Sequence, residues 1–227
     1  MKTAHLFSRL SVCIASFNLL STAELDKLVH AFKPLCSDRN QLLVSSSESN
    51  QRLYFVADGL IRQYSMMHFV DKPDIMIDRG FVLPTHFILS AASFQTTNGH
   101  ALHAETIKRT FLLYIERKVL DQLFVEIPVI KLVILHIMEQ YFFELERLNV
   151  ILHISNCQMR YEYFCFHFAE HIQQVPNKYI AQFLNISHSE LSRIRNRMAK
   201  GEQLYANHFP PIHLSSVQSS TLVGARR

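Results

Sequence analysis

Hydrophobic residues near the start of the chain fall on one face of a helix. They recur at spacings of three and four residues: Leu6, Leu10, Ile14 and Phe17. Arg9 interrupts this apolar stretch, which favours a short amphipathic helix over a signal peptide. Ser21 and Glu24 then have the spacing of a capping box, in which each side chain bonds to the other residue's free backbone N–H. We therefore expect two helices in this part of the chain.

The pattern changes between about residues 40 and 116, where short runs of alternating or β-branched apolar residues are separated by turn signals. Asp58 and Gly59 stand between two of these runs, as is typical of a hairpin. The runs cover residues 41–45, 52–57, 60–66, 75–77, 101–107 and 110–115. Short antiparallel strands of this kind predict a β-roll or barrel.

A third pattern begins at Pro128, which suits the first turn of a long helix. Apolar residues then repeat as in a coiled-coil seam, at Ile134, Met138, Tyr141, Leu145, Leu148 and Leu152. A second apolar face is formed by Ile130, Val133, Ile137 and Phe142. Two alternatives remain open: one face packs on a partner subunit, or both faces form one broad stripe in a monomer. A capping box over 155–158 predicts a further helix from Met159 to about Ile172.

The stretch from Val175 to Lys200 has the spacing of a helix-turn-helix. Five apolar residues would form its small core: Ile180, Leu184, Ile186, Leu191 and Ile194. Asn185 stands at the turn, where a positive φ is required and Asn tolerates it. Ser187 and Glu190 form a capping box. The second helix is therefore predicted to begin at Ser187.

The N-terminal part of this second helix would be the part that enters a DNA groove. The residues projecting from it are His188, Ser189, Ser192, Arg193 and Asn196, and Arg193 is the candidate for a bidentate contact to guanine. Residues suited to phosphate are Arg195, Arg197 and Lys200 on the flanks, with Lys178, Tyr179 and the free N–H groups near Ser187. The alternative is an ordinary helical hairpin with a solvated basic face.

Charge is unevenly distributed along the chain. Residues 176–227 contain seven Lys or Arg against two Asp or Glu, whereas residues 1–175 contain sixteen against seventeen. This asymmetry predicts an anionic partner for the C-terminal part. The cysteines are widely separated, at Cys13, Cys36, Cys157 and Cys165, which favours reduced thiols in the cytoplasm over a disulfide framework. No apolar run is long enough to cross a bilayer, so no membrane partner is expected.

The residues His167, Glu170 and His171 match a zinc-protease spacing in which two histidines share a helix face. Such a site needs a third ligand. Only Glu190 and Glu202 follow among the acidic residues, and Glu190 is already assigned to a cap. The dispersed cysteines likewise do not fit an iron–sulfur cluster. We therefore predict no metal site and no enzymatic activity.

The order of elements, from helices through antiparallel strands and a long helix to the helix-turn-helix, resembles the Crp/Fnr family of transcription regulators. Three segments carry the resemblance: Leu53–Tyr64, Arg160–Phe164 and Val175–Met198. The run Leu-Ser-Arg-Ile-Arg at 191–195 is similar to the branch common in Bacteroidetes-type bacteria. By position in the motif, His188, Ser189 and Arg193 match the family's base-reading residues, and Ser187 matches a phosphate-contacting N-cap.

The resemblance implies an α+β protein with a jelly-roll or β-roll sensor domain of the cyclic-nucleotide-binding type. It further implies homodimerisation through the long helix, binding of double-stranded DNA, and RNA polymerase as a candidate partner. The domain boundaries we expect are 1–120 for the N-terminal helices and sensor, 121–153 for the dimerisation helix, 154–205 for the DNA-binding domain and 206–227 for an irregular tail.

Two segments depart from the family pattern. Residues Phe87–Thr106 contain no Gly-Glu pair and no Arg, although cyclic-nucleotide binders of the family use both to hold the ribose and phosphate. Cyclic AMP in the usual mode is therefore not expected, no cofactor is predicted, and the effector is not identified. Residues Gly201–Phe209 show no pair of alternating strands, so the wing that follows the reading helix is expected to be absent or reduced.

Overall fold

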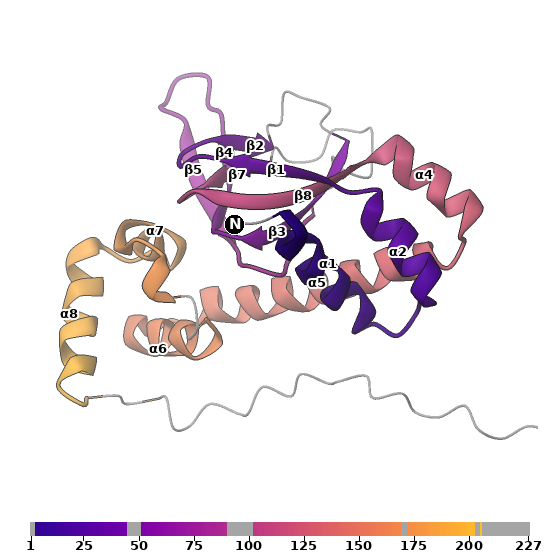
Figure 1. Cartoon of the computed structure of the whole chain (residues 1–227). Coiled ribbons are helices and arrows are strands. Elements are labelled where there is room, and N and C mark those ends of the chain that lie inside the picture. The colour runs from indigo at the N-terminus through magenta and orange to yellow at the C-terminus, as the bar shows by residue number, and fades with distance from the viewer. Residues whose placement is uncertain (1–2, 45–50, 90–101, 169–171, 203–204, 206–227) are drawn as a thin grey trace, which may run out of the picture.

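Helices cover a pair of antiparallel sheets in the computed structural model, which describes residues 3–44, 51–89, 102–168, 172–202 and 205 (Figure 1). The described strands are β1 (Lys33–Ser37), β2 (Leu42–Val44), β3 (Arg52–Asp58), β4 (Ile61–Met67), β5 (Ile75–Val82), β6 (Phe87–Ile88), β7 (Leu102–Thr106) and β8 (Thr110–Glu116). The helices are α1 (Thr3–Ala15), α2 (Thr22–His30), α4 (Arg117–Glu126), α5 (Ile130–His153), α6 (Cys157–His167), the 3-10 turn η1 (Ile172–Gln174), α7 (Asn177–Phe183) and α8 (His188–Ala199).

The two sheets have the strand orders β1-β8-β3-β6 and β2-β7-β4-β5, and all their pairs are antiparallel. Apolar side chains from both sheets form one buried cluster: Val44, Tyr54, Val56, Ile61, Val82, Ile88, Ala104 and Leu112. This arrangement confirms the predicted β-roll. The strands β1 and β6 were not among the predicted runs, and β5 continues past the predicted 75–77 to Val82.

A second core lies between the first sheet and the helices α1, α2, α4 and the first half of α5. Leu6, Leu10 and Ile14 on α1 are buried against it, as the helical spacing predicts. The capping box of α2 is complete, since Ser21 Oγ accepts the Glu24 N–H at 3.4 Å and Glu24 Oε2 accepts the Ser21 N–H at 2.9 Å. The N-terminal helices thus pack as a layer on the β-roll.

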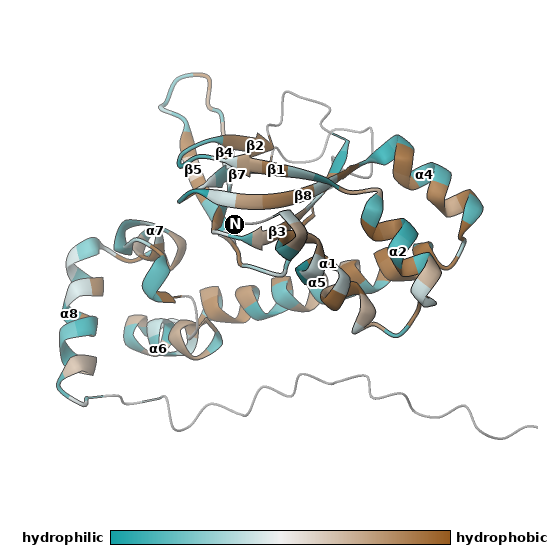
Figure 2. Ribbon diagram, in the orientation of Figure 1, coloured by the Kyte–Doolittle hydropathy of each residue, from teal (hydrophilic) through white to brown (hydrophobic). Residues whose placement is uncertain are grey.

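The long helix α5 begins two residues after Pro128 and runs beneath the β-roll toward α6 (Figure 1). Brown and teal alternate along it, because apolar residues occur on more than one of its faces (Figure 2). The first half of α5 belongs to the core of the β domain, and its second half connects that domain to the C-terminal helices.

In the ranges that the structure describes, no helix combines the length and apolar character needed to span a bilayer.

The helix before the helix-turn-helix differs from its prediction at both ends. Its N-cap is Asn156, whose Oδ1 accepts the Met159 N–H at 2.9 Å, and not Ser155. It ends at His167, well before the predicted Ile172, which instead opens η1. Periodicity does not reveal this break, since Phe164, Phe168 and Ile172 keep a helical spacing across it.

Candidate nucleic-acid interface

The helices α7 and α8 share one small apolar core. Ile180, Leu184 and Ile194 are fully buried, Leu191 is 1% exposed, and Ile186 packs against the same cluster. These are the five residues that the helix-turn-helix spacing predicts. Ala181, which is 4% exposed, belongs to the same cluster. The motif therefore folds as the sequence indicates.

The turn between α7 and α8 also has the predicted chemistry. Asn185 adopts φ 51°, the left-handed conformation that Asn tolerates. Ser187 is the N-cap of α8, and its Oγ accepts the Glu190 N–H at 3.1 Å. Glu190 itself contributes to ion pairs, with Arg193 Nη1 at 3.2 Å and Arg197 Nη2 at 3.7 Å. The Ser187 half of the predicted capping box is thus present, and it fixes the start of α8.

The face of α8 opposite its buried residues is polar and exposed. His188, Ser189, Ser192, Arg193, Arg195, Asn196, Arg197 and Lys200 are all exposed. Figure 2 shows α8 mostly in teal and white, at the end of the molecule opposite α2 and α4. The side chain of Arg193 retains 71% of its exposure although it pairs with Glu190. The candidate base-reading residues therefore lie together on a solvent-facing helix with a defined N-terminus.

Three predicted phosphate contacts lie around the N-terminus of α7. Lys178 is exposed, with its Nζ 4.5 Å from the centroid of the Tyr179 ring. Arg195 Nη1 donates a hydrogen bond to Asn177 Oδ1, which holds this guanidinium beside α7. Tyr179 differs from its prediction, since it is only 7% exposed and its ring packs against Arg62 of the β domain. Burial of the ring removes Tyr179 from the set of solvent-facing contacts.

Arg160 of α6 holds the helix-turn-helix to the end of α5. Its Nε donates to Ile154 O at 2.8 Å, its Nη1 to Leu184 O at 2.6 Å and its Nη2 to Ser155 O at 3.4 Å. Ile154 and Leu184 are the C-caps of α5 and α7, where backbone carbonyls lack helical partners. One side chain thus satisfies the ends of two helices, a role that the sequence alone did not suggest.

The predicted coiled-coil residues of α5 differ in how far their own chain covers them. Ile134 is 7% exposed in the core of its own β domain, and Tyr141 packs against the same core. Leu148 packs against the apolar cluster of the helix-turn-helix. Met138 and Leu152 are 47% and 41% exposed. A partner could therefore reach only part of the predicted seam. The reason is that residues such as Ile134 and Tyr141 share a helix face that the β-roll already covers.

The interior of the β-roll contains polar atoms without partners. Gln63 Nε2 and Ser65 Oγ on β4 are buried and hydrogen-bond to no other atom of the described residues. They stand opposite Ala104 and Leu102 of β7, on the strand face that carries Ile61 of the inter-sheet cluster. Residues 90–101, which make up most of the segment that departs from the phosphate cassette, lie outside the described residues. So do most of Gly201–Phe209, where the wing is expected to be absent or reduced, and the whole tail.

His167 is half-buried beside Tyr163 and Phe166, and neither of its ring nitrogens has a hydrogen-bond partner among the residues that the structure describes. Burial lowers the pKa of His167 to about 4, with a smaller effect from the charge of Arg147, so the ring is neutral at pH 7. Glu170 and His171, the rest of the zinc-type spacing, lie outside the described residues. Within the described residues, no group of three or more suitable ligands could hold a metal ion.

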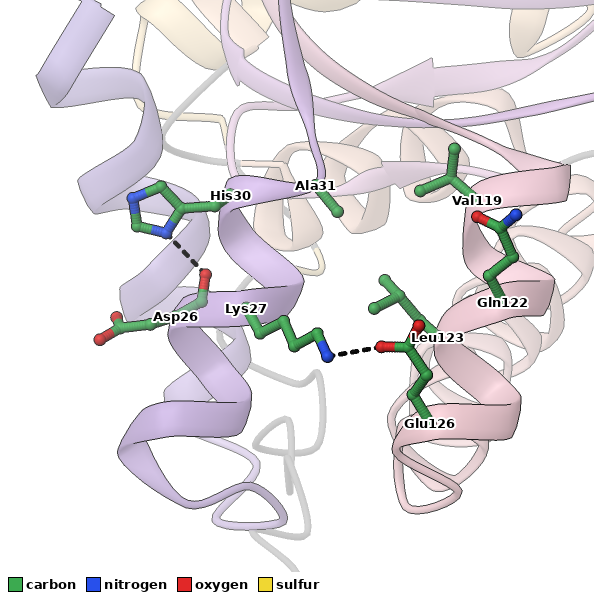
Figure 3. A pocket seen from close by; sticks show the side chains of 8 residues that line it. All are labelled: Asp26, Lys27, His30, Ala31, Val119, Gln122, Leu123 and Glu126. Carbon is green, nitrogen blue, oxygen red and sulfur yellow. Dashed lines mark hydrogen bonds and ion pairs between the residues drawn. The ribbon is translucent and has the colours of Figure 1, made fainter.

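A hollow in the surface lies between α2 and α4, far from α8 (Figure 3). Lys27 reaches across it to Glu126 at 2.5 Å, and His30 Nδ1 lies 2.7 Å from Asp26 O. The Lys27 and Glu126 side chains are 54% and 51% exposed, so this is a surface ion pair between two helices. Lys27 and Glu126 are thus already paired with each other, and the hollow does not point to a particular ligand.

Comparison with known proteins shows the fold. No family model matches the chain, and no curated protein is similar to it in sequence. Solved structures with the same fold include FixK2 from Bradyrhizobium japonicum, with a TM-score of 0.61 and 15% identity over 75% of this chain and 85% of that one. They also include the regulator CLP from Xanthomonas campestris, described as responsive to c-di-GMP, with a TM-score of 0.59 and 16% identity over 80% and 93% of the two chains.

A candidate transcriptional regulator of the Crp/Fnr family from Eubacterium rectale is similar to the same degree, with a TM-score of 0.59 and 14% identity over 82% and 87% of the two chains. These structural neighbours confirm the predicted α+β fold, with its β-roll and C-terminal helices. The Bacteroidetes-type branch stays a prediction.

Proposed function

We propose that this protein is a sequence-specific, DNA-binding transcription regulator that acts as a homodimer. The observation that carries the proposal is the division of α8 into two faces. Leu191 and Ile194 bind it to its own domain, and the opposite face presents Ser189, Ser192 and Arg193 to solvent from a capped N-terminus. An α-helix with this division fits the major groove, where polar side chains can reach base edges.

In this function some side chains of α8 would contact bases and others would contact phosphates. Arg193 has the fork geometry for the O6 and N7 atoms of guanine, and Asn196 one turn away suits adenine. Arg195, held beside α7 by Asn177, and the exposed Lys178 lie where the phosphates flanking the groove would pass. RNA polymerase remains a partner that the family resemblance predicts.

Selection of bound sequences from a random DNA pool tests this function. A two-fold symmetric site would support both DNA reading and dimerisation, because the symmetry of a dimer is repeated in its half-sites. Arg193→Ala should relax preference at one base pair and cost about 1–3 kcal/mol. Lys178→Ala should instead weaken binding to all sequences and reduce the salt slope by about 1. Failure to bind any pool at low salt would favour a module of the same fold that binds ligands or proteins and not DNA.

The dimer contact in this proposal is the exposed face of α5. Apolar residues repeat along it at spacings of three and four: Leu135, Met138, Phe142, Leu145 and Leu152, with Asn149 filling the gap in the repeat. Phe142 is 57% exposed and Leu135 52%, which is unusual for such large apolar side chains unless a partner covers them. Asn149 falls at an a position, where a polar residue selects the register of a two-stranded coiled coil.

The β-roll would act as a sensor that does not bind cyclic AMP in the usual mode. The one buried arginine of β4, Arg62, already pairs with Asp78 and so is not free for a phosphate. The unpaired Gln63 Nε2 and Ser65 Oγ inside the roll suit a polar, uncharged group better than a phosphate. Calorimetric titration with cyclic AMP should give no saturable heat, and micromolar binding would contradict this part of the proposal.

A further inference from the structure

The helix-turn-helix of α7 and α8, called the reading unit below, is held against the β domain of its own chain around a buried arginine. Arg62 of β4 pairs with Asp78 of β5, and the two side chains are only 6% and 3% exposed. The guanidinium binds both carboxylate oxygens, with Nη2 3.0 Å from Oδ2 and Nε bonded to Oδ1. The pair sits next to an irregularity of the β4–β5 ladder, where the register shifts between Gln63 and Tyr64. Both charges thus belong to one hairpin.

The same guanidinium reaches the first helix of the helix-turn-helix. Nη2 lies 3.3 Å from Gln182 Oε1, and the guanidinium carbon lies 4.5 Å from the ring centroid of Tyr179. Tyr64 of β4 lies on the same cation, at 5.1 Å. Because a guanidinium donates only along the directions of its fork, α7 cannot slide along β5 and keep these contacts. The arginine therefore fixes a position as well as a contact.

Apolar contacts surround this polar centre. The Phe81 ring lies 5.8 Å from Phe183 of α7 and 6.5 Å from Phe164 of α6. Leu60 and Ile107 of the β domain lie in the same cluster as the core of the helix-turn-helix. At the edge, Lys108 Nζ donates to Gln174 Oε1 at 2.7 Å. The contact between the two units is thus continuous, and the buried Arg62–Asp78 pair lies within it.

We propose that the Arg62–Asp78 pair is a clamp that holds the reading unit in its binding arrangement and couples the β4–β5 hairpin to DNA affinity. The ion pair lies wholly within the hairpin, so it survives whether α7 is docked or released. Release loses only the contacts to Tyr179, Gln182 and the surrounding apolar side chains. The charges of Arg62 and Asp78 are therefore paired both when α7 is docked and when it is released. A movement of the hairpin can shift the balance between these two states.

The effect on DNA rests on the proposed function, whereas the docking itself does not. In the docked arrangement the candidate base-reading residues of α8 are exposed, so this arrangement is open to DNA. A released unit samples other orientations, and the apparent affinity falls with the fraction that is docked. The phosphate contacts of the docked form are unchanged, so the salt dependence should keep its slope.

The test compares two variants that weaken the clamp with one that preserves it. Arg62→Met combined with Asp78→Asn removes the cation without leaving a buried charge, and Tyr179→Leu removes the aromatic face from the other side. Tyr179→Phe keeps the ring and is the matched control. Hydrogen exchange of α7 amides and DNA affinity are measured for each full-length variant, with circular dichroism as the check that each is folded.

Both weakened variants should exchange the α7 amides about fivefold to tenfold faster and lose a similar factor in DNA affinity at an unchanged salt slope. The control should match the unmodified protein. Unchanged exchange in folded variants would overturn the clamp, and tighter DNA binding with faster exchange would overturn the claim that the docked arrangement is the binding one. If no form binds DNA, the proposed function fails, but the exchange comparison still decides the docking.

Discussion

Replacing Arg160 by methionine should loosen the helix-turn-helix from the rest of the chain. Methionine keeps much of the aliphatic stem but removes all three hydrogen bonds that the guanidinium donates, to Ile154 O, Leu184 O and Ser155 O. These carbonyls stand at the end of α5, the end of α7 and the link into α6. A single substitution therefore affects the three places where the reading unit joins its support.

The size of the effect follows from how well water can replace each bond. The bond to Ser155 O is exposed and 3.4 Å long, so its loss should cost little. Leu184 is fully buried, and a buried carbonyl that loses its donor costs about 1–3 kcal/mol. The bond to Ile154 O is partly buried, and charged donors contribute about 1.5–3 kcal/mol each. Taking the lower end for Ile154 and the middle for Leu184, the expected loss is about 3.5 kcal/mol.

Urea unfolding followed by far-ultraviolet circular dichroism measures this loss. Arg160→Lys should recover less than half of it, because an ammonium cannot donate along the fork directions of a guanidinium. Arg197→Met is the matched control, since Arg197 forms a long surface ion pair of 3.7 Å with Glu190, and removal of this pair should cost about 0–1 kcal/mol. If Arg160→Met costs no more than Arg197→Met, the joint is held by its apolar contacts and the reasoning is refuted.

Three further predictions concern other parts of the molecule. Phe142→Glu should turn the proposed dimer into a monomer by sedimentation, because it places a charge on the exposed apolar face of α5, whereas Val125→Glu on α4 should leave the proposed dimer intact although Val125 is 82% exposed. Glu190→Gln should strengthen DNA binding at low salt without changing the preferred sequence, since it frees Arg193 and Arg197, and weaker binding would contradict this. The folded state keeps His167 neutral down to about pH 4, whereas in the unfolded chain His167 takes up a proton below about pH 6.5. The free energy of unfolding should therefore fall as the pH is lowered from 7 to 5. The slope from this group should stay below about 1.4 kcal/mol per pH unit. His167→Leu should flatten that slope, and an unchanged slope would show that other groups cause it.

The helix-turn-helix could be predicted almost residue by residue because its determinants are local. The core spacing, the positive φ of Asn185 and the N-cap of α8 all depend on residues within a short stretch of chain. The same holds for the complete capping box of α2. Signals of this kind are satisfied by neighbours in sequence, so tertiary packing does not overrule them.

The faces of α5 could not be predicted in the same way. A helix with apolar residues on several faces does not say which face its own domain covers, and the seam that includes Ile134 and Tyr141 combined a covered face with an exposed one. The prediction of the α6 N-cap was wrong for a related reason. Ser155 and Asn156 both suit an N-cap, and which of them caps the helix depends on where α5 ends. In both cases the deciding partner lies far away in the sequence.

The arginines show why charge by itself locates a binding surface only roughly. Arg62 and Arg160 lie outside the basic C-terminal stretch and are used internally, by a carboxylate in one case and by backbone carbonyls in the other. Arg193 and Arg197 share the carboxylate of Glu190 and remain exposed on α8. Both arginines also contact α7 or its C-cap, Arg62 from the β domain through Tyr179 and Gln182, and Arg160 from α6 through Leu184 O. The position of α7 and α8 therefore depends on arginines that never need to touch DNA, whereas the proposed specificity would depend on arginines that the fold leaves exposed.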